Sequence, residues 1–276
     1  MLWGENMILK ELTKISNEVR KGIITAIHSA KSGHPGGSLS SADILTYLYF
    51  EAMNIDPNNP QKLDRDRFVL SKGHAAPAYY SVLALKGFIN IEDLKTLRKV
   101  GSYLQGHPDM KHTNGVDMSS GSLGQGISAA VGMALAGKLK NIDYKVYTIL
   151  GDGELQEGQV WEASMFAGAR GLDNLVVIVD NNGLQIDGNI KAVCSPYPIE
   201  EKFKAFNFNV ISIDGHNFEE IHRAFERTKE KNGKPYAIIA KTIKGKGVSF
   251  MENQAGWHGS APNDEEYELA INELSS

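Results

Sequence analysis

The fold is decided by the stretch KVYTILGDG at residues 145–153, in which an apolar run leads directly into a polar turn. The same pattern returns in LVVIVDNN at 175–182, and two further apolar runs at 209–213 and 236–240 also end in polar residues. Helical patterns at 157–170 and 217–231 separate these runs. Apolar strands that alternate with helices are typical of a parallel sheet covered on both faces. The sequence therefore predicts an α/β fold, a mostly parallel sheet with helices on both faces.

Four further elements are predicted upstream of residue 145: a helix over 8–30, a helix over 41–53, a short strand over 68–70 and a helix over 125–139. The second helix is expected to have Ser40 or Ser41 as its N-cap and Asp43 in its first turn. Downstream, residues 263–276 are predicted to form a short acidic helix.

The composition excludes several classes of protein. Of 276 residues, 42% are hydrophobic and 22% are charged, which is ordinary for a globular domain. The net charge of −4 argues against nucleic acid or an anionic membrane surface as a partner. No apolar run approaches the length of a membrane span, and the first residues lack the pattern of a secretory signal. The single cysteine, Cys194, excludes an internal disulfide framework and fits a reducing compartment, so we expect a cytoplasmic protein.

Polar side chains follow the two central apolar runs directly. If these two strands are neighbours, their ends lie about 4.8 Å apart, so Asp152 and Asn182 would present oxygens to the same point. A carboxylate, an amide oxygen and a loop carbonyl suit Mg²⁺ or Ca²⁺ and leave room for phosphate oxygens. Gly153 would let a phosphate approach the backbone. Taken separately, each motif is also compatible with a simple strand-end turn.

The pair of motifs, GDG at 151–153 and NN at 181–182, resembles the thiamine-diphosphate-binding motif. Further motifs narrow the resemblance to transketolases, and they occur in that family's order: SGHPG at 32–36, DRFVLSKGH at 66–74, GHP at 106–108, GSLGQGI at 121–127, GDGELQEG at 151–158, KTIKGKG at 241–247 and WHG at 257–259. The chain thus resembles transketolases between residues 32 and 259.

This resemblance implies roles for particular residues. His34, His107 and His258 would hold the hydroxyls of the donor sugar and move protons, a task that suits imidazole near neutral pH. The residues expected to bind thiamine diphosphate are Lys72, His74, Gly121, Leu123, Gly153, Glu157, Asn182, Lys244 and His258. The residues expected to hold Mg²⁺, or Ca²⁺ or Mn²⁺ in its place, are Asp152, Asn182 and Leu184. The alternative for His34, His74, His107 and His258 is a set of four structural loop histidines. We interpret the other four, His28, His112, His216 and His222, as surface or satisfied core residues.

Two further patterns have more than one interpretation. Gly124-x-Gly126-x-x-Ala129 fits a dinucleotide fingerprint, but residues 112–120 are no strand, so we reject a nicotinamide cofactor. Glu157 and Glu162 are either an exposed acidic helix start or, by the resemblance, part of a buried network at a subunit interface.

The resemblance covers the diphosphate-binding (PP) domain only. Residues 1–276 would form this single domain, with a helical N-terminal segment over 1–60, and the pyrimidine-binding and C-terminal domains would lie outside this chain. We therefore expect the N-terminal subunit of a two-chain transketolase, although an excised piece of a longer chain would have the same sequence. Two copies of this chain and two of a separate C-terminal subunit would form a heterotetramer. That assembly would transfer a two-carbon ketol unit from a ketose phosphate to an aldose phosphate in the pentose phosphate pathway.

Two alternatives have the same fold. The first is half of another thiamine-diphosphate enzyme, a deoxyxylulose-phosphate synthase or the α subunit of a 2-oxo acid dehydrogenase. Those families share the GDG and NN motifs but not the GHPG and WHG set. The second is a non-catalytic module that kept the fold, because fold alone does not secure function.

Overall fold

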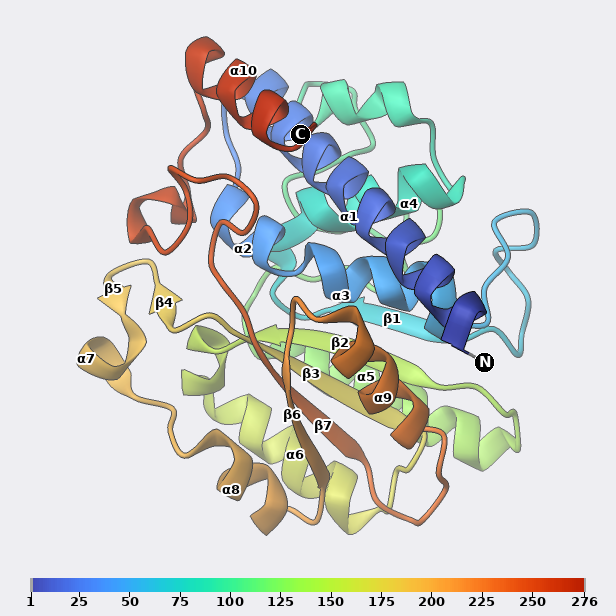
Figure 1. Ribbon diagram of the computed structural model, residues 1–276. Helices are drawn as coiled ribbons and strands as arrows, with labels where there is room; N and C mark the ends of the chain where they lie inside the picture. Colours follow the sequence, from blue (N-terminus) through green and yellow to red (C-terminus); the bar gives the residue numbers. More distant parts are fainter. Residues whose placement is uncertain (1, 276) are drawn as a thin grey trace.

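A five-stranded parallel sheet forms the centre of the molecule (Figure 1). The computed structural model describes residues 2–275, with side chains from residue 9 onward. Its strands are β1 (Arg67–Leu70), β2 (Val146–Gly151), β3 (Leu175–Asn181), β6 (Asn209–Asp214) and β7 (Tyr236–Lys241). They lie in the order β1-β2-β3-β7-β6, and every pair is parallel. The predicted strands and their parallel arrangement are confirmed.

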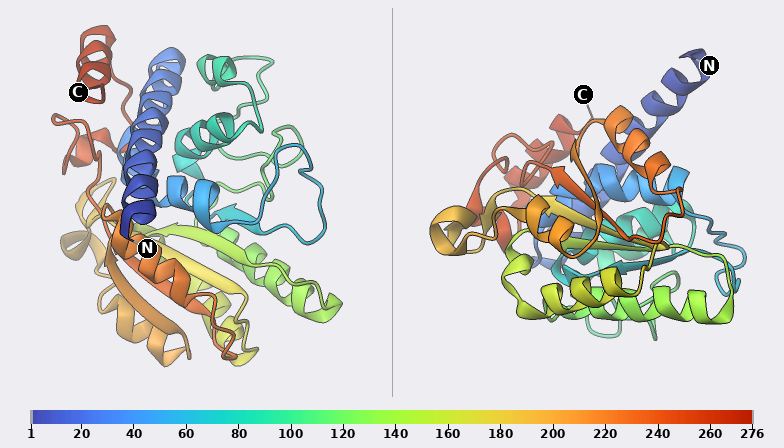
Figure 2. Two further views of the ribbon diagram at one scale, coloured as in Figure 1. Left: turned by 45° about the vertical axis from the view of Figure 1, so that its right-hand side comes forward. Right: turned by 90° about the horizontal axis from the view of Figure 1, so that it is seen from below.

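Successive strand residues face two separate cores. In β2, Ile149 packs into one apolar cluster and its neighbour Leu150 into the other, as the twofold alternation of a strand requires. Figure 2 shows the sheet between the two helical layers that complete these cores. One layer contains α5 (Gln125–Lys140), α6 (Gly158–Ala169) and α8 (Ile199–Ala205); the other contains α1 (Leu2–Ala30), α3 (Ala42–Tyr47), α4 (Ala76–Lys86), α9 (Phe218–Arg227) and α10 (Asp264–Glu273). The prediction of helices on both faces is therefore correct.

The predicted helix over 41–53 is confirmed to within one residue at each end. It consists of α3 and a π-helical turn, η1 (Leu48–Ala52), and a separate short helix, α2 (Pro35–Ser40), precedes it. Ser41 does precede α3, but its hydroxyl donates to the carbonyl of Gly37 at 2.9 Å and caps nothing. The hydroxyl of Ser40 donates to Asp180 at 2.6 Å. Both serines are buried and bonded elsewhere, so neither side chain caps this helix.

Several elements were not predicted. They include α4, α8, the short helix α7 (Ile190–Cys194), the two-stranded hairpin β4 (Leu184–Gln185) and β5 (Gly188–Asn189), and the 3₁₀ turns η2 (Gly73–Ala75), η3 (Ile91–Thr96), η4 (Gly153–Gln156) and η5 (Ala255–His258). Helix α4 is buried along nearly its whole length, so its sequence has no polar face and no helical period of hydrophobicity. Within the described part of the chain, no helix is long and apolar enough to cross a bilayer.

Candidate functional site

A cavity of about 290 Å³ lies at the carboxyl edge of the sheet, where ligands bind in folds of this class. It lies at the ends of β1, β2 and β3, beside the segment that follows β7. Most of the residues predicted for cofactor or metal line this cavity: Lys72, His74, Leu123, Asp152, Gly153, Glu157, Asn182, Leu184, Lys244 and His258. The fold thus brings together side chains as far apart in the sequence as Lys72 and His258, which are separated by 186 positions.

Three predicted residues lie beside the cavity without lining it. The ring of His34 is 5.2 Å from that of His74 and 5.5 Å from that of His258, measured between centroids. Gly121 lies against His107, because a Cβ on this glycine would be 3.1 Å from the imidazole. His107 and Gly121 both belong to the irregular segment 97–124, which borders the rim of the cavity. His107 is exposed in the chain alone.

The predicted metal ligands Asp152 and Asn182 follow neighbouring strands, as expected. The carboxylate of Asp152 accepts backbone N–H groups from Gly153 at 2.9 Å and Gly183 at 2.6 Å, and the side-chain oxygen of Asn182 accepts from the amide of Leu184 at 3.1 Å. Burial and the nearby Asp180 raise the pKa of Asp152 to about 6, and a bound cation would oppose this rise.

The donor set fits a hard cation that shares its coordination with a phosphorylated ligand. Among the described residues, no three His, Cys, Asp or Glu side chains are grouped closely enough to hold a metal ion. A cation at this point would need amide and carbonyl oxygens, and oxygens of a bound diphosphate, in addition to the carboxylate of Asp152. Asn182 and the carbonyl of Leu184 supply such oxygens, and the latter accepts from Lys244 Nζ at 3.3 Å. Mg²⁺ is usually bound by a few protein oxygens together with phosphate oxygens, and seldom by protein ligands alone, so this arrangement suits Mg²⁺.

Lys72 and Asp180 form a buried ion pair beneath the cavity. The ammonium of Lys72 also donates to the carbonyl of Gly37 at 2.7 Å. The carboxylate of Asp180 accepts in addition from Ser40 and Thr242. Burial alone would raise the pKa of Asp180, but Lys72 and the hydrogen bonds hold it below its usual value. Asp180 therefore balances the charge of Lys72 and holds its ammonium in a fixed place, and Asp180 is a site residue that the sequence analysis missed.

A second lysine lies on the opposite side with His74 and His258, and His34 lies behind them. Lys244 Nζ lies 3.0 Å from His258 Nδ1, and burial with the charge of Lys72 lowers the pKa of Lys244 to about 8. Burial, reinforced by Lys244, lowers the pKa of His258 to about 4. Burial, reinforced by Arg98, likewise lowers the pKa of His34 to about 4.

With these lowered pKa values, the imidazoles of the site are neutral at neutral pH. The pKa of His74 is lowered well below its usual value by burial and by Lys72. His34 Nδ1 is buried with no hydrogen-bond partner among the described residues. A buried polar atom without a partner costs free energy unless a ligand or water satisfies it. The site therefore fits an anionic ligand with hydroxyl groups.

Glu154 is a second residue that the sequence analysis missed. It is buried, and its two oxygens accept from the hydroxyl of Ser71, the amide of Gly124 at 2.9 Å and the amide of Gly151 at 3.1 Å. Burial raises its pKa. One carboxylate thus joins the three loops that carry Lys72, Leu123 and Asp152. The signal was its place inside the GDGE motif, next to residues already assigned to the ligand.

Two glycines allow the loops to approach one another this closely. A Cβ on Gly36 would lie 2.9 Å from Lys244 Cγ, and a Cβ on Gly126 would lie 2.6 Å from the Cα of Ser71. Neither contact leaves room for a larger residue. The SGHPG and GSLGQGI motifs are therefore required for packing around the cavity as well as for contact with a ligand.

The comparison with known proteins agrees with this geometry. The family model described as "Transketolase, thiamine diphosphate binding domain" matches residues 12–275. The chain belongs to the transketolase family. The 6-deoxy-6-sulfo-D-fructose transketolase subunit SqwG of Clostridium sp. (strain MSTE9) is 49% identical over 264 residues, which is 96% of each chain. An apulose-4-phosphate transketolase subunit from Phocaeicola vulgatus is 43% identical, and the match covers 98% of this chain and 95% of that one.

Full-length transketolases match over the same region. Human transketolase is 42% identical over 97% of this chain, which spans only 42% of that protein. The crystal structure of transketolase from Campylobacter jejuni superposes with a TM-score of 0.90 at 38% identity, covering 96% of this chain and 42% of that one. The predicted thiamine-diphosphate-binding fold is confirmed. The end-to-end matches to chains named as subunits also confirm the prediction of an N-terminal subunit of a two-chain transketolase that binds thiamine diphosphate.

Proposed function

We propose that this chain, with a separate C-terminal subunit, transfers a two-carbon ketol unit from a ketose phosphate to an aldose phosphate, using thiamine diphosphate and Mg²⁺. The observation that carries the proposal is the convergence of Asp152, Asn182, Lys244 and the histidine cluster on one cavity at the carboxyl edge of the sheet. The names of the relatives favour a transketolase over the other thiamine-diphosphate enzymes considered above.

The lower part of the cavity would bind the diphosphate. Asp152, Asn182 and the carbonyl of Leu184 would hold Mg²⁺ against the phosphate oxygens, while Lys244 supplies positive charge and Lys72, paired with Asp180, donates from the cavity wall. When bound, thiamine diphosphate supplies a nucleophilic carbon in its thiazolium ring. Leu123 and Gly121, on the loop fixed by Glu154, would support the organic part of the cofactor.

The histidines would act on the sugar. Because Lys244 donates to Nδ1 of His258, the proton of this neutral ring resides on Nε2, which can donate to a hydroxyl group. His34 offers an unpartnered Nδ1, and His107 lies at the rim. Together they would orient the donor hydroxyls and exchange protons with them.

The partner subunit would cover an apolar edge of this cavity. Ile186, which lies in the hairpin β4–β5 and lines the cavity, is 66% exposed. Val193, in the helix α7 that follows this hairpin, is 44% exposed. Exposed apolar side chains that border a polar site are typical of surfaces that another chain covers. A C-terminal subunit placed there would complete the cofactor site.

A second copy of this chain would pack on the outer face of α5 and α6. The large apolar residues exposed there are Leu139, Met165 and Phe166. Glu157 and Glu162 are also exposed in the single chain, so their burial in an interface requires a second chain. Two copies of each subunit would give the heterotetramer. We further assign the reaction to the pentose phosphate pathway and the protein to the cytoplasm, on the chemistry of the proposed substrates and the single, exposed Cys194.

Reconstitution tests the proposed function. The partner is obtained by copurification from the native cell, and the pair is assayed with thiamine diphosphate, Mg²⁺ and a panel of ketose donors. The panel includes a sulfonated and a phosphorylated ketose, because the relatives are named for both. The expected result is ketol transfer by the pair, loss of transfer in Asp152→Ala, and full transfer in Asp143→Ala, an exposed control far from the cavity.

Two results would contradict the proposal. Reaction of the pair with pyruvate but with no ketose donor would favour a synthase of the deoxyxylulose-phosphate type. Unchanged cofactor binding in Asp152→Ala together with no reaction of any donor would favour a non-catalytic module.

A further inference from the structure

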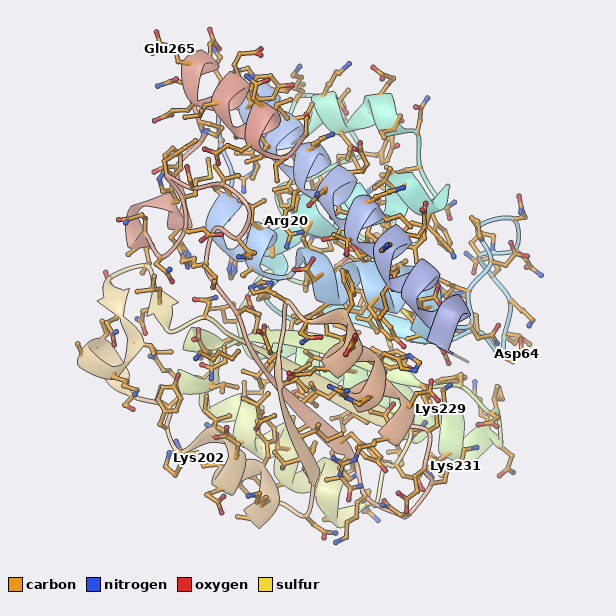
Figure 3. All side chains as sticks on the ribbon, in the orientation of Figure 1. Arg20, Asp64, Lys202, Lys229, Lys231 and Glu265 are labelled. Atoms are coloured by element: carbon orange, nitrogen blue, oxygen red, sulfur yellow. The ribbon has the colours of Figure 1, made fainter. Side chains whose placement is uncertain are left out.

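A buried network of side chains lies next to the cavity without lining it. Asp43 of α3 accepts from both terminal nitrogens of Arg20, with Nη1 at 3.0 Å from Oδ1. Ser16 and His216 also donate to Asp43, with His216 Nδ1 at 2.7 Å from Oδ2. Figure 3 labels Arg20 on α1, beside the segment of α2 and α3. Burial alone would raise the pKa of Asp43, but Arg20 and His216 hold it below its usual value, so the group is a carboxylate.

This network ends on the backbone at both sides of Lys244. His216 Nε2 accepts the amide hydrogen of Ile243 at 2.9 Å. Arg20 Nε donates to the carbonyl of Lys246 at 3.0 Å. One network therefore contacts the residue before Lys244 and the second residue after it.

The segment 243–247 depends on such contacts for its shape. It belongs to no helix or strand, and Gly245 and Gly247 have φ values of +81° and +93°. Its other backbone bonds to the rest of the chain include Gly245 N to Gly36 O at 3.0 Å. At the end of the Lys244 side chain, Nζ contacts His258 and the carbonyl of Leu184. A glycine-rich segment without these anchors would sample many conformations, and Lys244 would move with it.

The imidazole of His216 has one defined tautomer in this setting. A backbone N–H can only donate, so Nε2 must be the acceptor and the ring proton must reside on Nδ1. That proton is donated to Asp43. The carboxylate thus fixes the ring, and the ring in turn fixes the amide of Ile243, which is how a carboxylate orients a histidine in many active sites.

We propose that His216, oriented by Asp43 and Arg20, is a positioning residue that holds the segment 243–247 so that Lys244 faces the bound diphosphate. The identity of the anion rests on the proposed function, whereas the contact between His216 and the segment does not. His216 lies outside the lining of the cofactor cavity and reaches it through this segment, so its effect is indirect.

Two substitutions of His216 test its bond to Asp43 and its bond to the amide of Ile243 separately. In His216→Asn, the amide nitrogen takes the place of Nδ1 and still donates to Asp43, but nothing accepts from Ile243. In His216→Gln, the side-chain oxygen takes the place of Nε2 and can accept from Ile243. The matched control is His222→Asn, which changes a histidine of α9 that is bonded to Tyr47 and remote from the segment. Thermal unfolding of the full chain verifies that all three variants fold.

Two measurements on the full chain do not need the cofactor. They are the hydrogen exchange of the amides at 243–247 and the rate at which Lys244 is acylated. A third measures the affinity for thiamine diphosphate with Mg²⁺ in the complex with the partner subunit. For His216→Asn we expect exchange and acylation to be at least about fivefold faster and affinity about five- to tenfold lower, the loss of roughly one buried hydrogen bond. His216→Gln and His222→Asn should stay within about twofold of the wild type, the scatter expected when no such bond is lost.

Unchanged exchange and acylation in His216→Asn would overturn the proposal. Faster exchange with an unchanged rate of acylation would also overturn it, because the segment would be held without positioning Lys244. If the wild-type complex binds no thiamine diphosphate, the proposed function fails. Exchange and acylation then still decide whether His216 positions Lys244.

Discussion

Replacing Asp180 by Asn should destabilise the chain strongly, because it removes the full negative charge that is paired with the Lys72 ammonium. Asp180 is 0% exposed and Lys72 is 1% exposed, so water cannot replace the lost partner. Breaking one side of a buried ion pair costs about 3–5 kcal/mol. The asparagine would retain some of the hydrogen bonds from Ser40 and Thr242, which favours the lower half of that range.

Urea denaturation of the full chain measures this effect. With a denaturant dependence of roughly 3 kcal/mol per molar, a loss of about 3–4 kcal/mol lowers the midpoint by about 1 M. The double variant Lys72→Met with Asp180→Asn should recover at least about half of the loss, since no buried ammonium is left without a counter-charge. A loss below about 1 kcal/mol in Asp180→Asn, or a double variant no more stable than the single one, would refute this reasoning.

Three further predictions concern the site and its scaffold. Burial lowers the pKa of Lys244 to about 8, so its charge is present below that pH and is lost above it. Calorimetry on the complex should therefore show affinity for thiamine diphosphate falling about tenfold between about pH 7 and pH 9, and no such fall in Lys244→Arg. Glu154→Gln turns an amide donor toward the backbone N–H groups of Gly124 and Gly151, so urea denaturation should show that the free energy of unfolding falls by about 2 kcal/mol. An unchanged midpoint would mean that this carboxylate does not join the loops. Gly168→Ala should lower the stability by about 3 kcal/mol or more, because its Cβ would lie 1.7 Å from the carbonyl oxygen of Phe206. Gly132→Ala, at an exposed position of α5, should raise the stability by up to about 1 kcal/mol. Equal effects of the two substitutions in melting experiments would contradict the packing described.

The sheet could be predicted because its strands are rich in apolar residues and each is followed by a polar turn. The residues that line the cavity could be predicted for a related reason: parallel strands bring their carboxyl ends to one edge. Asp152 and Asn182 follow neighbouring strands and were found by this logic, with the family resemblance adding Lys244 and His258. Helix α4 was missed since it is buried all round and its sequence has no amphipathic period.

The supporting residues could not be predicted because their importance comes from pairing across long distances in the sequence. Asp180 directly follows an apolar run and looks like part of a strand-end turn. Nothing local indicates that it neutralises Lys72, which is 108 positions away. His216 was interpreted as a surface or core histidine, whereas its two ring nitrogens join Asp43 to Ile243. Ser40 was expected to cap a helix, but its hydroxyl is bonded to Asp180.

The central claim is that this chain holds half of a cofactor site that a second subunit completes. Calorimetric titration of thiamine diphosphate in the presence of Mg²⁺ tests it most directly, first with this chain alone and then with the chain saturated by its copurified C-terminal partner. We predict weak binding by the chain alone and markedly tighter binding by the complex, because Ile186 and the cavity edge beside it are left uncovered in the single chain. Tight binding by the chain alone, unchanged when the partner is added, would contradict the account.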